Sequence, residues 1–112
     1  MGEVVILVCP SHRLTNLWNV SIPPEYVFEK LDVTLYNDIT KRAELLKERE
    51  LTTRTIIIID TEAENDVPIT TLRDHAELIV IVCDIKNTVP HKIVAMWRSP
   101  SERSVKMIEK IN

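Results

Sequence analysis

The stretch "TIIIID", residues 55–60, decides the fold of this chain: four consecutive isoleucines stop at Asp60, and an acidic segment, "TEAENDVP", follows. A strand that is apolar on both of its faces is buried on both, which is typical of a parallel sheet covered by helices. Six residues suit a strand and are too few for a core helix. We therefore expect residues 55–60 to form a central parallel strand that ends at a carboxylate.

Working outward, similar short runs rich in Val and Ile recur along the chain, and they predict four more strands: Glu3–Cys9, Asp32–Asn37, Glu77–Asp84 and Lys92–Arg98. Helical patterns lie between them, at residues 21–31, 38–50 and 99–111, with a shorter one at 68–75. This alternation predicts an α/β protein, a three-layer α/β/α sandwich with a five-stranded, mostly parallel sheet in the flavodoxin-like order 2-1-3-4-5. The connection "IKNTVP", residues 85–90, leaves open whether the fifth strand is parallel.

Two of the predicted helices carry start signals. Asp38 is the expected N-cap of the helix over residues 38–50, in which Ile39, Ala43 and Leu46 share one face. In the helix over residues 99–111, the opening "SPSE" combines a serine cap, a proline in the first turn and a glutamate three residues after the cap. We expect both helices to pack against the sheet through their apolar stripes.

The composition bounds the class of protein. The chain has 112 residues, 45% of them hydrophobic and 28% charged, which predicts a single globular α/β domain over residues 1–112. No apolar run approaches the ~20 residues of a membrane span, and the amino terminus lacks signal-peptide features. We therefore expect a cytoplasmic protein without membrane contact. The absence of glutamine and the abundance of charged side chains are a thermophile-like composition.

Glycine scarcity excludes several ligand-binding motifs. The only glycine is Gly2, so the chain has none of the glycine-rich loops that let a backbone approach a phosphate group. Dinucleotide and Walker-type nucleotide sites are therefore excluded. We expect no cofactor, with magnesium as the one candidate.

In an open α/β sheet, ligands bind beyond the carboxyl ends of the strands, so residues at that edge are the candidates. Asp60 and Asp84 end neighbouring strands of the predicted sheet, where two carboxylates could share Mg²⁺ or a proton. The alternative is that both only terminate strands or cap turns. The catalytic candidates are Asp60, Asp84, His12 and Cys9, and the binding candidates are Ser11, His12, Arg13, Lys86, Arg98, Trp18 and Trp97.

Partial resemblances run through the same edge. The segment "CPSHR", residues 9–13, resembles the cysteine-bearing first loop of low-molecular-weight tyrosine phosphatases and of cysteine-phosphorylated sugar-transport domains, which would make Cys9 a nucleophile. Their phosphatase pattern has arginine six positions after the cysteine, where this chain has Thr15. Asp60 also resembles in position the phosphoacceptor of receiver domains, but Cys9 and Pro10 replace the acidic pair of that family. This resemblance implies a receiver-like shape without the phosphorylation motif.

Charge is unevenly distributed. Residues 86–112 carry six basic and two acidic side chains, a net charge of +4, whereas residues 1–85 carry eight basic and fifteen acidic ones, a net charge of −7. A basic segment beside an acidic body can bind an anion or dock onto another copy. Nucleic-acid binding would use the segment's basic residues, Lys92, Arg98, Arg103, Lys106 and Lys110.

Three functions follow from these observations. The first is a small binding or regulatory module that acts through protein–protein contact or self-association, for example as a homodimer. The second is a small Mg²⁺-dependent phosphoryl-transfer or nuclease-type enzyme that uses Asp60 and Asp84. The third is a nucleic-acid-binding protein that uses the basic carboxyl-terminal segment. The first is favoured, so we expect a binding protein rather than an enzyme.

Overall fold

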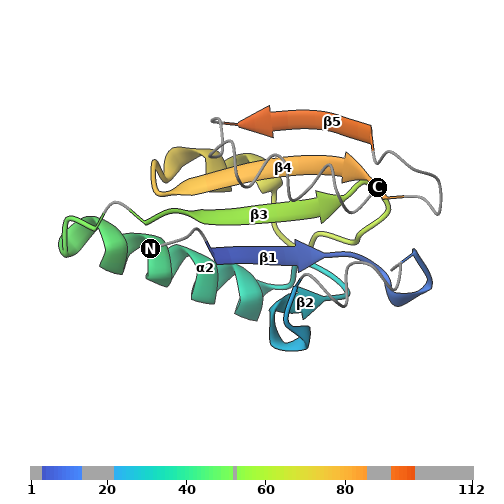
Figure 1. Cartoon of the computed structure of the whole chain (residues 1–112), viewed down its shortest axis with the longest axis horizontal. Coiled ribbons are helices and arrows are strands. Elements are labelled where there is room, and N and C mark those ends of the chain that lie inside the picture. Colours follow the sequence, from blue (N-terminus) through green and yellow to red (C-terminus); the bar gives the residue numbers. More distant parts are fainter. Residues whose placement is uncertain (1–3, 14–21, 52, 86–91, 98–112) are drawn as a thin grey trace.

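In the computed structural model, the chain forms an α/β domain with a helix packed along a parallel sheet (Figure 1). The structure describes residues 4–13, 22–51, 53–85 and 92–97, the last of these for the backbone only. Four parallel strands lie in the order β2-β1-β3-β4: β1 (Val4–Val8), β2 (Val27–Phe28), β3 (Thr55–Asp60) and β4 (Leu78–Asp84). The predicted α/β class and the parallel order 2-1-3-4 are confirmed.

A further strand, β5 (Lys92–Trp97), pairs with β4 in the antiparallel direction, with a register shift between Val82 and Cys83. Parallel strands need a long crossover, whereas a short connection returns the chain antiparallel, and only residues 85–91 separate β4 from β5. The side chains of β5 lie outside the described residues, as does the helix predicted for residues 99–111. A third layer formed by that helix therefore stays a prediction.

The isoleucine run of β3 has both faces buried, as its sequence predicts. Ile57 and Ile59 point to the face that α2 (Val33–Glu48) covers, and Ile56 and Ile58 to the opposite face. All four are fully buried. Because the strands are in register, with Ile58 opposite Leu7 on β1 and Ile81 on β4, each face presents a continuous layer of branched apolar side chains.

The sequence prediction is wrong between residues 21 and 37. Residues 32–37, predicted as the second strand, are the cap and first turn of α2, whose buried positions Leu35, Ile39, Ala43 and Leu46 follow helical spacing. The helix begins where the Asp32 carboxylate accepts a hydrogen bond from Leu35 N at 2.7 Å. Asp38, the predicted N-cap, is an exposed residue inside the helix.

The actual second strand lies where a helix was predicted. The segment at residues 21–31 holds the 3₁₀ turn η2 (Pro24–Tyr26) followed by β2, which is paired with β1 through only two residues. A strand of two residues leaves no periodic pattern to read. The helix predicted for residues 68–75 is the 3₁₀ helix η3 (Ile69–Asp74).

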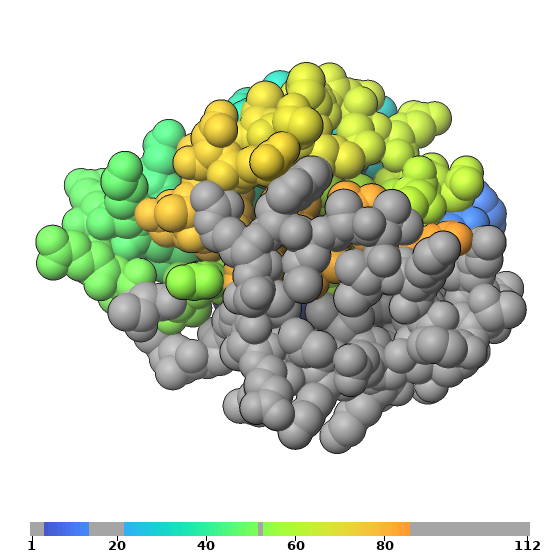
Figure 2. Space-filling view, turned by 90° about the horizontal axis from the view of Figure 1, so that it is seen from above, coloured from blue at the N-terminus to red at the C-terminus, as the bar shows by residue number. Residues whose placement is uncertain are grey.

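The side chains at the carboxyl-terminal end of α2 lie far from those of the segment that follows β1. Figures 1 and 2 agree that the carboxyl-terminal end of α2 lies at one end of the molecule and the segment that follows β1 at the other. No helix in the described part of the chain has both the length and the apolar character that a membrane span needs.

Candidate functional site

The carboxyl edge of the sheet brings together several of the predicted site residues. The register sets Asp60 opposite Cys83 on β4, and Cys9 follows Val8, whose partner is Ile59. Cys9, Asp60 and Cys83 thus fall in one row across three strands, and all three are buried. The structure thus brings two of the predicted site residues, Cys9 and Asp60, to one edge of the sheet, whereas the roles assigned to them stay predictions.

Asp60 is held by Arg13. The 3₁₀ turn η1 (Ser11–Arg13) turns the chain back over the sheet edge, and Arg13 then contacts both oxygens of Asp60, with Nε–Oδ2 at 2.6 Å and Nη2–Oδ1 at 3.0 Å. This bidentate geometry is the strong form of an arginine–carboxylate pair. It fixes the first loop to the end of β3.

The same guanidinium also contacts Asp84, with Nη2–Oδ1 at 2.7 Å. The two carboxylates that were candidates to share Mg²⁺ both contact the guanidinium of Arg13, and hydrogen bonds to both raise the pKa of Arg13 above its ordinary value. Within the described residues, no three metal-binding side chains of His, Cys, Asp or Glu are grouped closely enough to hold an ion. Sequence reasoning placed Arg13 at this edge but missed its role as the link between the carboxylates.

Backbone and hydroxyl donors complete the surroundings of Asp60. Its Oδ1 accepts from Glu62 N at 3.3 Å, from Ile85 N at 3.4 Å and from the Thr61 hydroxyl at 3.5 Å. These donors come from the loop after β3 and from the end of β4. Together with Arg13 of the first loop, they make one buried carboxylate the link between three chain segments. A buried charge is retained at low cost only when it is paired and hydrogen-bonded in this way.

The surroundings of the two cysteines at this edge disfavour the thiolate form. Cys9 Sγ lies 3.5 Å from Asp60 Oδ2, as a hydrogen-bond donor. Burial, together with the negative charge of Asp60, raises the pKa of Cys9 to about 12 and that of Cys83 to about 11. Because the thiolate is the reactive form, these surroundings oppose the nucleophilic role considered for Cys9.

The remaining predicted site residues are spread out. Ser11 and His12 are exposed, and Ser11 N donates to Glu29 Oε1 at 3.4 Å. Hydrogen bonding from Ser11, aided by His12, lowers the pKa of Glu29. Trp97 and Lys92 lie on β5, paired with Val80 and Asp84, and their side chains are outside the described residues. So are the other predicted binding and nucleic-acid-contacting residues: Trp18, Lys86, Arg98, Arg103, Lys106 and Lys110.

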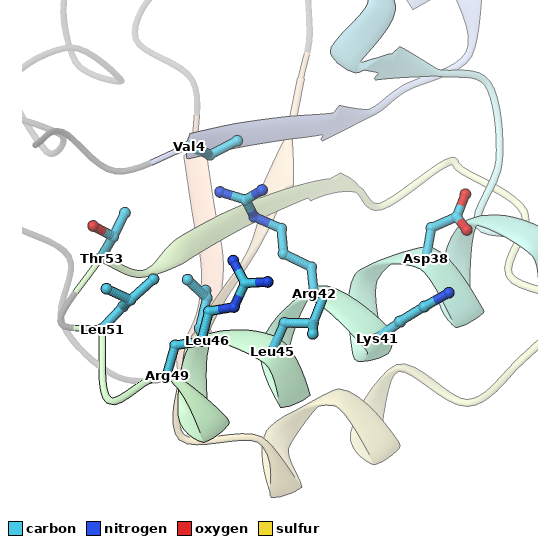
Figure 3. Close-up of a pocket in the computed structure, with 9 residues that line it drawn as sticks. All are labelled: Val4, Asp38, Lys41, Arg42, Leu45, Leu46, Arg49, Leu51 and Thr53. Atoms are coloured by element: carbon cyan, nitrogen blue, oxygen red, sulfur yellow. The ribbon is translucent and has the colours of Figure 1, made fainter.

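A second candidate site, which sequence reasoning missed, lies at the opposite edge of the sheet. It is a cavity of about 440 Å³ between α2 and the amino-terminal ends of β1 and β3, which we call the α2 groove (Figure 3). Its lining consists of Val4, Asp38, Lys41, Arg42, Leu45, Leu46, Arg49, Leu51 and Thr53. The groove is therefore apolar at its base and rich in cations at its rim.

The α2 groove owes its shape to the end of α2. Glu50 adopts a left-handed conformation, with φ of 53°, and the amides of Glu50 and Leu51 donate to Lys47 O and Leu46 O at 3.1 and 3.0 Å. This pair of bonds is the Schellman ending, in which the residue after the left-handed one packs onto the last helical turn. It explains why Leu51 stands beside Leu46 in the groove.

The cations of the α2 groove come from one flank of the helix. Lys41, Arg42 and Arg49 lie beside Leu45 at spacings of three and four residues, which places them along one side of α2. Arg42 extends toward the strands (Figure 3), and its Nε donates to the Thr55 hydroxyl at 3.0 Å. A sequence signal did exist: Leu45 is apolar but lies outside the buried stripe.

The α2 groove is thus a surface with exposed apolar side chains and accessible charge, whereas the carboxyl edge is an internally satisfied cluster. Such a groove can hold an apolar group by burial and an anion by hydrogen bonding. The chain was compared with protein-family models, with curated proteins and with solved structures, and none of them matches it.

Proposed function

We propose that this chain is a small binding module that acts through protein–protein contact, with the α2 groove as its contact surface. The observation that carries the proposal is the pairing of exposed leucines with cations in one hollow. Leu45 and Leu51 are 41% and 43% exposed, and within the described residues none of the three groove cations forms an ion pair. Exposed apolar surface rimmed by polar groups is typical of interaction sites.

The state of the carboxyl edge supports a binding role over a catalytic one. An enzyme that used Asp60 and Asp84 for Mg²⁺ would need both carboxylates to face the ion, and the guanidinium of Arg13 lies between them. The cluster instead has the features of a structural clamp. The expected receiver-like shape, with the helix predicted for residues 99–111 as a third layer, fits a domain that works through its surface.

Nucleic-acid binding has less support. The residues that would carry it are concentrated in the carboxyl-terminal segment, and their side chains lie outside the described residues. The body of the domain is acidic, and exposed carboxylates such as Glu62 and Glu64 follow β3. Self-association, as a homodimer for example, remains a form of the same binding function. It would use a second copy as the partner.

The proposal is tested by photo-crosslinking from the surface of α2. A photoreactive amino acid is placed at Leu45, inside the groove, or at Glu48, which is exposed on the same helix but does not line the groove, and each full-length chain is irradiated in cells that express it. We expect discrete protein adducts from position 45 and none of the same size from position 48. Identical adducts from both positions, or none from position 45, would count against the proposal.

A further inference from the structure

We infer that the α2 groove binds a peptide segment of another protein in which acidic side chains flank aliphatic ones. The inference rests on the binding function proposed above and deepens it by naming the chemistry of the partner. It follows from the charge of the groove, from its apolar base and from its length, each of which restricts the occupant.

The charge of the groove calls for an anion. Among the described residues, Lys41, Arg42 and Arg49 line it together with one carboxylate, Asp38, and no ion pair neutralises any of the three cations. Arg42 uses one N–H group on Thr55, which anchors the side chain, and no other described residue accepts from the rest of its five donors. Carboxylates match the fork geometry of arginine.

The apolar base calls for aliphatic side chains. Leu46 is 7% exposed and forms part of the core, whereas Leu45 and Leu51 stand above it more than two-fifths exposed. Burying these two leucines against a partner removes apolar surface from water, which a purely polar ligand cannot do. A phosphodiester strand offers charge but few aliphatic groups, so the combination favours a peptide over nucleic acid.

The length of the groove calls for an elongated occupant. Its lining residues run along α2 from Asp38 to Arg49 (Figure 3), twelve positions whose eleven steps span about 16 Å at 1.5 Å per residue. That length matches about five residues of an extended peptide, or about three turns of an amphipathic helix whose one face lies in a groove. A compact small molecule would contact only part of this line.

The test is a selection followed by a charge swap. Random twelve-residue peptides are displayed and selected on the full-length chain, and the enriched peptides are synthesised with a fluorescent label for anisotropy titration. We expect enriched sequences to combine Asp or Glu with Leu, Ile or Val. Binding should weaken at least tenfold for Leu45→Asp and for Arg49→Glu, and should be unchanged for Lys47→Glu, which alters an exposed cation of the same helix outside the groove.

The charge swap separates direct recognition from loss of folding. Peptides in which lysine replaces the acidic residues should fail on the wild-type chain and bind the Lys41→Glu/Arg49→Glu variant, since the sign of both partners is then reversed. No enrichment, enrichment of peptides without acidic residues, or binding that Arg49→Glu leaves unchanged would overturn the inference. So would Leu45-dependent binding of an RNA oligonucleotide or of a second copy of the chain in sedimentation, with no peptide binding.

Failure of the inference can be told apart from failure of the proposed function. Adducts that form from position 45 and persist in the Arg49→Glu chain would leave a protein-binding module standing and would exclude the acidic partner. Absence of position-45 adducts, by contrast, removes the proposed function and the inference together.

Discussion

Asp60 acts as a structural centre at the carboxyl edge. Its side chain is fully buried, and it accepts hydrogen bonds from the first loop, from the loop after β3 and from the end of β4. A buried charge without its partner is far more costly than an exposed one. The clamp therefore depends chiefly on Arg13, which supplies the compensating charge to Asp60 and to Asp84.

Replacing Arg13 tests this role. We expect Arg13→Ala to lower the free energy of unfolding by about 3 kcal/mol, because it leaves a buried carboxylate unpaired; urea denaturation followed by circular dichroism measures it. The matched control is Lys30→Ala, which removes the exposed Lys30–Asp66 pair and should cost less than about 1 kcal/mol. Equal effects of the two substitutions would show that the Arg13 cluster is no clamp.

The thiols beside Asp60 should make the free energy of unfolding depend on pH in the alkaline range. Their pKa values, about 12 for Cys9 and about 11 for Cys83, exceed the ordinary thiol value of 9.0, so above pH 9 the native state binds more protons than the unfolded one. The free energy of unfolding should therefore fall as pH rises through these values, while the contribution is fully present below pH 9. Urea midpoints measured at about pH 8 and about pH 10.5 show the fall.

The control for this pH dependence is the double variant Cys9→Ala/Cys83→Ala. Lysine and tyrosine side chains also titrate at alkaline pH, and the variant retains them. Its urea midpoint should decline less steeply between the two pH values than that of the wild-type chain. Parallel declines would mean that the thiols do not contribute.

At the scale of single residues, the sequence predicted which side chains lie at the carboxyl edge but not which of them contact one another. The rule that strand ends gather side chains placed Cys9, Asp60 and Asp84 at one edge, as the structure has them. The link through Arg13 depends on a three-residue 3₁₀ turn that reverses the chain, and such a turn has no periodic signature. Mg²⁺ was one candidate partner of the two carboxylates and stays a prediction, whereas the contact of both with the Arg13 guanidinium was not predicted.

Among the elements, long patterns were readable and short ones were not. The stripe of Ile39, Ala43 and Leu46 predicted the helix that buries them, and the isoleucine run predicted β3. The start of the helix was misplaced because "VTLYN", residues 33–37, alternates like a strand over so short a stretch. The α2 groove was also missed. It depends on where α2 ends relative to β1, and the periodicity of the helix does not show this.

The end of α2 provides a prediction at the element scale. Glu50 holds a left-handed conformation that costs an L-residue with a Cβ about 1 kcal/mol, and glycine is the usual residue there. We expect Glu50→Gly to raise the free energy of unfolding by about 1 kcal/mol in urea denaturation. Glu48→Gly, two residues earlier and at the last residue of the helix, should lower it by a similar amount, so a loss of stability in both variants would contradict the assigned ending.

For the molecule as a whole, the two edges of the sheet differ in the side chains that they expose. The carboxyl edge, where ligands of open α/β folds bind, is closed by a network of hydrogen bonds around the buried carboxylate of Asp60. The amino edge carries the α2 groove, with its exposed leucines and with cations that form no ion pair within the described residues. The proposed function would therefore separate binding from stability, and groove substitutions such as Arg49→Glu should change binding while the core stays intact.

This separation, together with the composition, predicts a thermally robust molecule. The strands β1, β3 and β4 bury apolar side chains on both faces of the sheet, and a chain with one glycine and no glutamine has less unfolded-state entropy to lose and fewer thermolabile amides. We expect a calorimetric Tm above about 65 °C at neutral pH, beyond the usual mesophilic range. Arg49→Glu should leave that Tm nearly unchanged, whereas Arg13→Ala should lower it by several degrees. A wild-type Tm within the mesophilic range would contradict the expected robustness. Equal shifts for both variants would contradict the division of the molecule into a rigid edge and a binding edge.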